Sequence, residues 1–177
     1  MARDGTVAPP YHECSQDRGP FMKKTLKDIT PRTSTIYPKP YDEVVKGRTK
    51  YVLGNAFDLN QFGVNLTVLA PGGMTALRHW HSAEDEFIYV LDGEVTLITD
   101  EGDTLMRAGE FVGFKAGVPN GHCFANRSGQ DVRILEVGTR NIAQDKGFYP
   151  GLDLMVKATP DGKRGFFKLS GEPYTGE

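Results

Sequence analysis

Short runs of hydrophobic and polar residues recur along the chain, and their pattern predicts β-strands rather than helices. The runs are rich in β-branched and aromatic residues and are separated by glycine, proline or aspartate. The predicted strands cover residues 62–69, 76–81, 86–91, 94–99, 111–114, 122–126, 132–137, 154–158 and 166–169. Asp92-Gly93 between two of these runs is a strong hairpin signal. Regularly spaced short strands without helical periodicity predict an all-β sandwich or barrel.

The N-terminal part of the chain lacks this pattern. Residues 1–22 are polar, contain prolines and show no apolar periodicity, so we expect a flexible leader, with Met22 as an alternative start. Residues 23–50 hold three prolines and a glycine, which block helix interiors and central strands. We therefore expect an extended arm over 23–50 and a single domain, ending in a C-terminal strand extension, over 51–177.

Composition and charge narrow the class of protein. The chain has 177 residues, which suits one domain with a hydrophobic core. Its formal net charge is -2, which argues against a nucleic acid or an anionic membrane as partner. Two cysteines, Cys14 and Cys123, are too few for a disulfide scaffold. With no signal-peptide core and no apolar run of about 20 residues, we expect a soluble, cytoplasmic protein.

The histidines suggest chemistry. Of the four, His12 lies in the leader, whereas His79 and His81 share one face of a predicted strand, because strand side chains alternate with period two. Glu86 opens the next strand after a short turn, and His122 comes from a distant strand that a barrel can bring across. Three imidazoles and one carboxylate suit one divalent ion of Fe, Mn, Ni, Co, Zn or Cu. Four protein ligands leave positions open for substrate, dioxygen or water.

Residues beside these histidines have simpler expected roles. Cys123 follows His122 in a strand and should point to the opposite face as a buried thiol. Arg78 and Trp80 flank the first histidine pair and also face away from it. Asn126 shares the face of His122, where it can support the site or stabilise a turn.

The loop before His122 offers two candidate substrate contacts. Lys115 and Asn120 both lie in this loop and carry groups that can donate hydrogen bonds to a polar ligand. We therefore expect them near a bound substrate, with simple surface exposure as the alternative.

The spacing of these residues resembles a known family. Gly73-x5-His79-x-His81-x4-Glu86-x6-Gly93 is similar at every position to the first motif of the cupins. The second motif is matched in part, because His122-x3-Asn126 fits but the proline-x-glycine before the histidine does not. That element corresponds either to residues 115–117, with lysine replacing proline, or to residues 119–121, which lie closer to the histidine than the family pattern has them.

From about residue 29 onward the chain resembles small bacterial single-domain cupins labelled as sugar-phosphate (mannose-6-phosphate) isomerases. The stretches that carry the resemblance are QFGVNLTVLAPGG, RHWHSAEDEFIYVLDGEV, GVPNGHCFANRS and LEVGTR. The resemblance implies a double-stranded β-helix, also called a jelly-roll barrel, with an N-terminal extended arm. It also implies a metal held by the four ligands above, a small-molecule ligand and a homodimer.

Three functions remain open at this point. A metal-dependent isomerase would polarise a carbonyl while a base moves a proton, and a sugar phosphate would need cations. Within the motif stretches only Lys115 is expected to reach the substrate as a cation, and no further histidine is left as base. A dioxygenase or decarboxylase needs a redox metal with open positions, and a non-catalytic protein would only hold a ligand. A fold shared this widely does not choose among them, so metal identity is the first discriminating observation.

Overall fold

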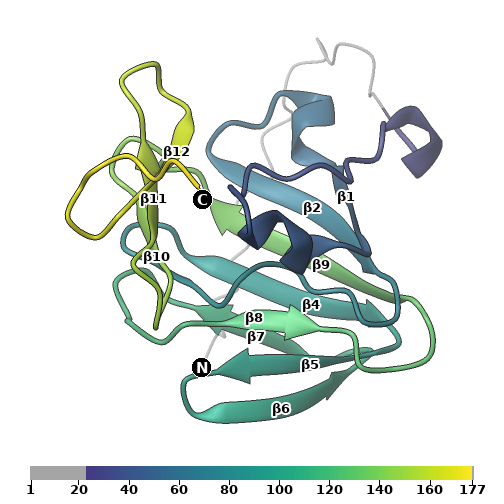
Figure 1. Ribbon diagram of the computed structural model, residues 1–177. Coiled ribbons are helices and arrows are strands. Elements are labelled where there is room, and N and C mark those ends of the chain that lie inside the picture. The colour runs from purple at the N-terminus through teal and green to yellow at the C-terminus, as the bar shows by residue number, and fades with distance from the viewer. Residues whose placement is uncertain (1–22, 177) are drawn as a thin grey trace, which may run out of the picture.

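The protein folds into antiparallel β-sheets with three short 3₁₀ turns (Figure 1). The structure is a computed structural model, and it describes residues 23–176. The 3₁₀ turns are η1 (Leu26–Asp28), η2 (Tyr41–Val45) and η3 (Gly54–Phe57). The strands are β1 (Arg48–Val52), β2 (Phe62–Leu69), β3 (Trp80–His81), β4 (Glu86–Asp92), β5 (Glu94–Thr99), β6 (Gly102–Arg107), β7 (Phe111–Phe114), β8 (Cys123–Ala125), β9 (Val132–Thr139), β10 (Lys146–Phe148), β11 (Met155–Ala158) and β12 (Arg164–Phe167).

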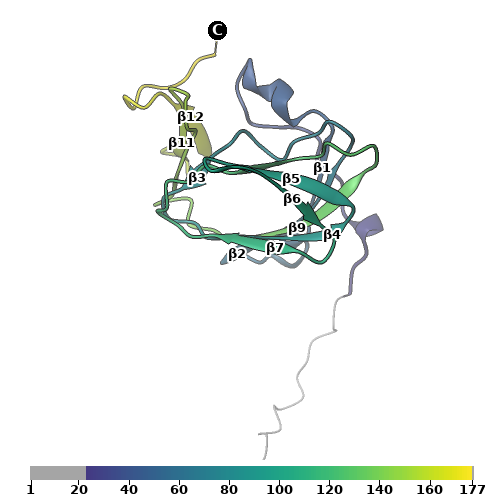
Figure 2. The same ribbon diagram turned by 90° about the horizontal axis from the view of Figure 1, so that it is seen from below.

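The strands form two opposed layers. One layer is a five-stranded sheet with the order β1-β2-β9-β4-β7. The opposite layer contains β6-β5-β8 and, beside it, β12-β11-β10-β3. In Figure 2, β5 and β6 lie on one side of the barrel, and β2, β4, β7 and β9 lie on the other. This arrangement confirms the predicted all-β jelly-roll fold.

A hydrophobic core fills the space between the layers. Valine, leucine and isoleucine side chains on alternating positions point inward, as a half-buried strand requires. The core residues are Leu69, Ile88, Val90, Val95, Leu97, Met106, Phe124, Val132 and Ile134. The predicted hairpin at Asp92-Gly93 joins β4 to β5, and Gly93 has a φ of 80°. A Cβ there would lie 3.1 Å from a methyl group of Val132, so the turn favours glycine.

The predicted strands agree with the structure in most places. Residues 62–69, 94–99 and 111–114 match β2, β5 and β7 at both ends. The predicted strand 76–81 shrinks to Trp80–His81, because His79 makes only an isolated bridge with His122. Three strands, β1, β6 and β10, were not predicted, and β1 begins at Arg48, inside the range assigned to the arm. The predicted leader 1–22 lies outside the described residues.

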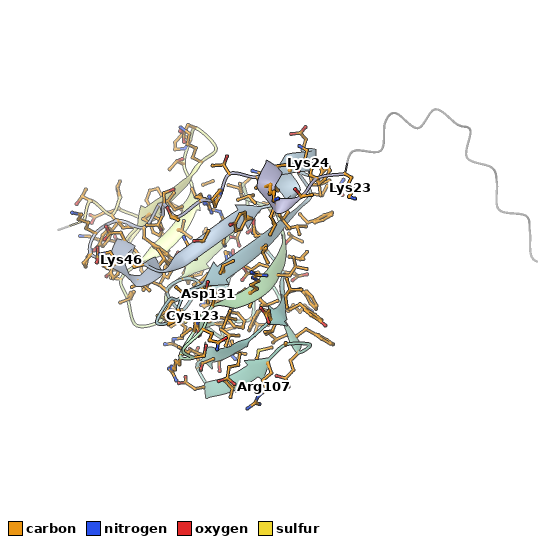
Figure 3. All side chains as sticks on the ribbon, turned by 90° about the vertical axis from the view of Figure 1, so that its right-hand side faces the viewer. Lys23, Lys24, Lys46, Arg107, Cys123 and Asp131 are labelled. Atoms are coloured by element: carbon orange, nitrogen blue, oxygen red, sulfur yellow. The ribbon has the colours of Figure 1, made fainter. Side chains whose placement is uncertain are left out.

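The N-terminal segment packs along the barrel. Its backbone pairs with β1 through a bridge between Arg32 and Lys50. Further on, Tyr37 contacts Tyr149 and Phe166, with ring centroids 5.9 and 5.3 Å away. In Figure 3, Lys23 and Lys24 lie at one end of the molecule, and Arg107, the last residue of β6, lies near the other. The segment thus contributes Tyr37 and Tyr41 to a second hydrophobic cluster.

Candidate metal centre

Three histidine rings gather where the two layers approach each other. The backbones of His79 and His122 exchange two hydrogen bonds, which bring two segments 43 residues apart into register. The ring of His79 lies 5.1 Å from the ring of His81 and 5.3 Å from that of His122. The structure therefore brings together the three histidines that the sequence indicated.

Two of these imidazoles are oriented by acceptors on their outer nitrogens. Nδ1 of His79 lies 2.8 Å from the carbonyl oxygen of Leu77, and Nδ1 of His81 lies 2.7 Å from Oδ2 of Asp145. A carbonyl oxygen can only accept, so Nδ1 of His79 carries the proton; the Asp145 carboxylate favours the same tautomer at His81. Each Nε2 then keeps a lone pair, which is the arrangement found where histidine binds a metal.

Glu86 completes the group from the five-stranded sheet. It opens β4, and its Oε2 lies 3.8 Å from Nε2 of His81 and 2.9 Å from Nε2 of His122. Burial opposes ionisation of this carboxyl. The hydrogen bond from His122 and the nearby histidines nevertheless outweigh burial and lower the pKa of Glu86 to about 2. The carboxylate is thus charged at neutral pH and ready to bind a cation.

Three of the four predicted ligands form one group, and the fourth, His122, lies beside it. Ligand atoms of His79, His81 and Glu86 lie within 4.8 Å of one another, as a shared ion requires. Nε2 of His122 is instead hydrogen-bonded to Oε2 of Glu86, and the His122 ring stacks on Phe114 with centroids 3.5 Å apart. Its Nδ1 is buried and has no hydrogen-bond partner among residues 23–176. The donor set fits a metal site at which His79, His81 and Glu86 converge and His122 lies beside them.

A buried acidic network behind His81 was missed by the sequence reasoning. Asp145 is almost fully buried, and its carboxylate also contacts Arg164 at 3.2 Å. Glu84, from the turn between His81 and Glu86, pairs with the same arginine at 2.5 Å. Asp145 and Glu84 could together hold a cation with His81. Asp145 directly precedes the unpredicted β10, so no periodic pattern marked its position.

The buried network shifts the pKa values of His81 and Asp145. Burial disfavours protonated His81, but the hydrogen bond to Asp145 and the charges of Glu86 and Asp145 outweigh it and raise the pKa of His81. Burial likewise disfavours ionised Asp145, but the bond from His81 lowers the pKa of Asp145. His79 lacks such a partner, and burial lowers its pKa to about 4. His79 is therefore neutral at physiological pH.

Two cavities meet at these residues. The larger, of about 630 Å³, is lined by His79, His81 and Glu86 together with five basic side chains. The smaller, of about 430 Å³, reaches His81, Glu86 and His122 from the side of β5 and β7. The site is thus open to small molecules from the larger cavity and bordered by a second one.

The candidate substrate contacts line the smaller cavity. Lys115 is exposed there, close to the loop that leads to His122. Asn120 also lines it, but its side chain accepts a hydrogen bond from the backbone of Asp100 and donates one to Glu101. The cationic residues that the isomerase interpretation required line the larger cavity instead, outside the motif stretches.

The residues beside the histidines have their own contacts, and Trp80 also lines the smaller cavity. Cys123 is buried and free, and burial raises the pKa of its thiol to about 11. Arg78 pairs with Asp100, and Trp80 stacks on Phe148 with centroids 4.6 Å apart. Asn126 is a turn residue, because its amide donates to the carbonyls of Leu69 and Gln130.

The loop before His122 contains a tight turn that contacts the strand of His81. Gly117 has a φ of 78°, and its N–H donates to the carbonyl of His81 at 2.8 Å. Residues 115–118 form a turn closed by a bond from Val118 to Lys115. The turn thus reaches the strand that carries His81.

Comparisons with known proteins agree with this geometry. Residues 65–138 match the model of the cupin domain family. The fold is similar to a sugar phosphate isomerase of the cupin superfamily from Silicibacter pomeroyi, with 39% identity and a TM-score of 0.82. That alignment covers 87% of this chain and 97% of the other.

More distant structures share the barrel. One is a protein from Acidithiobacillus ferrooxidans that has been proposed to be a sugar phosphate isomerase. It is 27% identical, the alignment covers 73% of this chain and 81% of the other, and the TM-score is 0.64. A predicted oxalate decarboxylase from Thermotoga maritima is 22% identical over 67% of this chain and 99% of its own, with a TM-score of 0.52. The latter likeness concerns the fold alone. None of the curated proteins matches the chain.

Between residues 23 and 176, no helix has the length and apolar character to span a membrane.

Proposed function

Because the chain belongs to the cupin superfamily, we propose that it binds one divalent metal ion and acts on a small polar metabolite there. The proposed ligands are His79, His81, Glu86 and His122. The observation that carries the proposal concerns the rings of His79 and His81. Nδ1 of each ring is hydrogen-bonded to an oxygen, which fixes the tautomer, and a ligand atom of each ring lies within 4.8 Å of one of Glu86. Such control is typical of ligands preorganised for a metal.

The donor set limits the ion and the chemistry. Imidazoles with one carboxylate suit Fe, Mn, Ni, Co, Zn or Cu, and such an ion supplies Lewis acidity toward a carbonyl or carboxylate oxygen. The protein residues position it: Asp145 fixes His81, and the low pKa of Glu86 keeps that carboxylate charged. The larger cavity provides room for a substrate beside these ligands.

The cavity favours a sugar-phosphate isomerase-like reaction among the open possibilities. Five basic side chains line it, which supports an anionic substrate and supplies the cations that the motif stretches lacked. Glu136 lies in the same cavity, paired with Lys50 at 2.6 Å, and offers a carboxylate that can transfer a proton. The similarity to the isomerase from Silicibacter pomeroyi supports the same direction.

A metal-dependent dioxygenase or decarboxylase is the alternative, with a non-catalytic ligand-binding cupin as the third possibility. Elemental analysis of protein purified without a metal-affinity tag is the first test, and about one metal per chain is expected. The loaded protein is then assayed for interconversion of aldose and ketose phosphates and for dioxygen uptake. Isomerisation without dioxygen uptake supports the proposal; dioxygen consumption with a substrate, or carbon dioxide release, contradicts the isomerase assignment. Protein that binds no divalent metal contradicts the metal function as a whole.

We propose that two copies of the chain pair through an aromatic face of the five-stranded sheet. This aromatic face consists of Phe87, Tyr89 and Phe111; the rings of Phe87 and Tyr89 lie 5.8 and 6.3 Å from that of Phe111. Phe111 is 65% exposed in the single chain, which is unusual for a phenylalanine and typical of a contact surface.

A cytoplasmic location and the absence of nucleic-acid and membrane partners stay predictions from charge and composition.

A further inference from the structure

The basic residues of the larger cavity are not equally engaged. Lys50 is paired with Glu136 at 2.6 Å, and Arg140 donates to Asn55 Oδ1 at 2.6 Å. Arg164 is held by the two buried carboxylates behind His81. These three cations therefore already have partners within the protein. The other two basic residues of the cavity are Arg48 and Arg32.

Arg48 is a buried cation with no carboxylate within salt-bridge distance among residues 23–176. It opens β1, is 8% exposed and lines the cavity that contains His79 and Glu86. Its Nη1 donates to the carbonyl of Thr75 at 2.5 Å, whereas its Nε is buried without a hydrogen-bond partner among residues 23–176. Burial lowers the pKa of this guanidinium, and the charge of Glu136, which lines the same cavity and is paired with Lys50, offsets that effect only in part. A guanidinium with an unpaired buried donor is destabilising, and an anion bound beside it would offset that cost.

Arg32 adds a second positive charge beside it. The bridge to Lys50 fixes its backbone next to β1, and its side chain is exposed at the same cavity. The charge of Arg32 acts on Arg48 in the direction that disfavours its protonated form, so the two are close enough to repel. No carboxylate pairs with Arg32 in the described part of the chain. Two cations that repel each other and face one cavity are the usual setting for an oxyanion.

The position of Arg48 connects it to the metal ligands. Arg48 interacts electrostatically with Tyr37, and Tyr37 shares a hydrogen bond with Tyr149. Tyr149 in turn stacks on His79, with ring centroids 5.9 Å apart. Arg48 thus lies across two aromatic rings from the proposed metal, within one cavity of about 630 Å³. Arg48 and the ligands His79 and Glu86 therefore border the same space.

We propose that Arg48, assisted by Arg32, binds an oxyanion of the substrate, a phosphate or a carboxylate, while the opposite end of the substrate faces the metal ligands. The inference rests on the proposed function and adds the substrate class and its orientation. Guanidinium groups bind both kinds of oxyanion through paired hydrogen bonds. The two arginines are therefore binding residues that select anionic metabolites.

Isothermal titration with inorganic phosphate and with acetate, at constant ionic strength, tests this subsite. The full chain is used in metal-loaded and metal-stripped forms, because an anion at Arg48 needs no metal. We expect Arg48→Gln to weaken binding of the preferred anion by about tenfold or more and Arg32→Gln by about threefold. Arg133→Gln is the control, because Arg133 is an exposed arginine on β9 that does not line the cavity. The anion that binds more tightly identifies the substrate group.

Each outcome bears on the inference separately from the metal function. Wild-type protein that binds neither anion, or folded Arg48→Gln that keeps wild-type affinity, would overturn it. If Arg48→Gln does not fold, Arg32→Gln decides: weakened binding supports the subsite and unchanged binding overturns it. If the protein takes up no divalent metal when it is offered one, and still binds the anion through these arginines, the proposed metal function is contradicted and the subsite stands.

Discussion

Nδ1 of His81 donates a hydrogen bond to Oδ2 of Asp145 at 2.7 Å, across 64 residues of sequence. Asp145 is 2% exposed, and its carboxylate also accepts from the backbone N–H of Ala83. The bond fixes one tautomer of His81 and aims its Nε2 at Glu86. Metal affinity should therefore depend on a residue that does not itself touch the metal.

Replacing Asp145 by asparagine should weaken metal binding by about 10–100-fold, because the side chain keeps its shape and loses its charge. Competition with a chelator of known affinity measures the change on protein shown to be folded by circular dichroism. Asp103→Asn is the matched control, since Asp103 forms an exposed pair with Arg127. Unchanged affinity in Asp145→Asn would show that this pair has no role in the site.

The thiol of Cys123 should resist modification in the folded protein. Burial raises its pKa to about 11, so at pH 8 almost all of it is the neutral thiol, and reactive thiolate forms only as the pH approaches that value. In a Cys14→Ser background, a chromogenic disulfide reagent at pH 8 should label Cys123 slowly in buffer and rapidly in denaturant. Equal rates in both conditions would contradict the buried assignment.

The aromatic face predicts a dimer that one charge can disrupt. Phe111→Asp should shift the protein toward a monomer of 19.5 kDa in sedimentation at micromolar concentration, because a buried unpaired carboxylate opposes association. Leu169→Asp serves as control, since Leu169 is similarly exposed near the C-terminus, away from that face. A wild-type protein that sediments only as a monomer would refute the proposed pairing.

The sequence predicted the elements whose local signals are strong. The Asp92-Gly93 hairpin and the run 62–69 carry turn and strand preferences in the residues themselves, and both appear in the structure. Strand β6 was missed because Gly102–Arg107 is mostly polar. Its strand conformation depends on pairing with β5 and not on the strand preference of its own residues. Strand β10 is three residues long around Gly147 and is defined by its neighbours β3 and β11.

The same contrast applies to the site. His79 and His81 were found because strand geometry places them on one face, a relation readable from spacing. Asp145 and Arg48 were not found, because their positions depend on contacts that connect distant segments: the pairing of β10 with β3, and the entry of β1 beside β2. Arg48 also lies in a segment that prolines marked as an arm, where no motif indicates a ligand contact.

Metal content per folded chain tests the central claim most directly. Wild-type protein, purified without a metal-affinity tag and loaded with one ion type, should hold about one divalent ion per chain. His81→Ala and His122→Ala should each lose most of it, because both are proposed ligands, whereas His12→Ala should keep wild-type content. Circular dichroism must first show that each variant is folded. Stoichiometric metal in folded His81→Ala or His122→Ala would contradict the four-residue site and the function built on it.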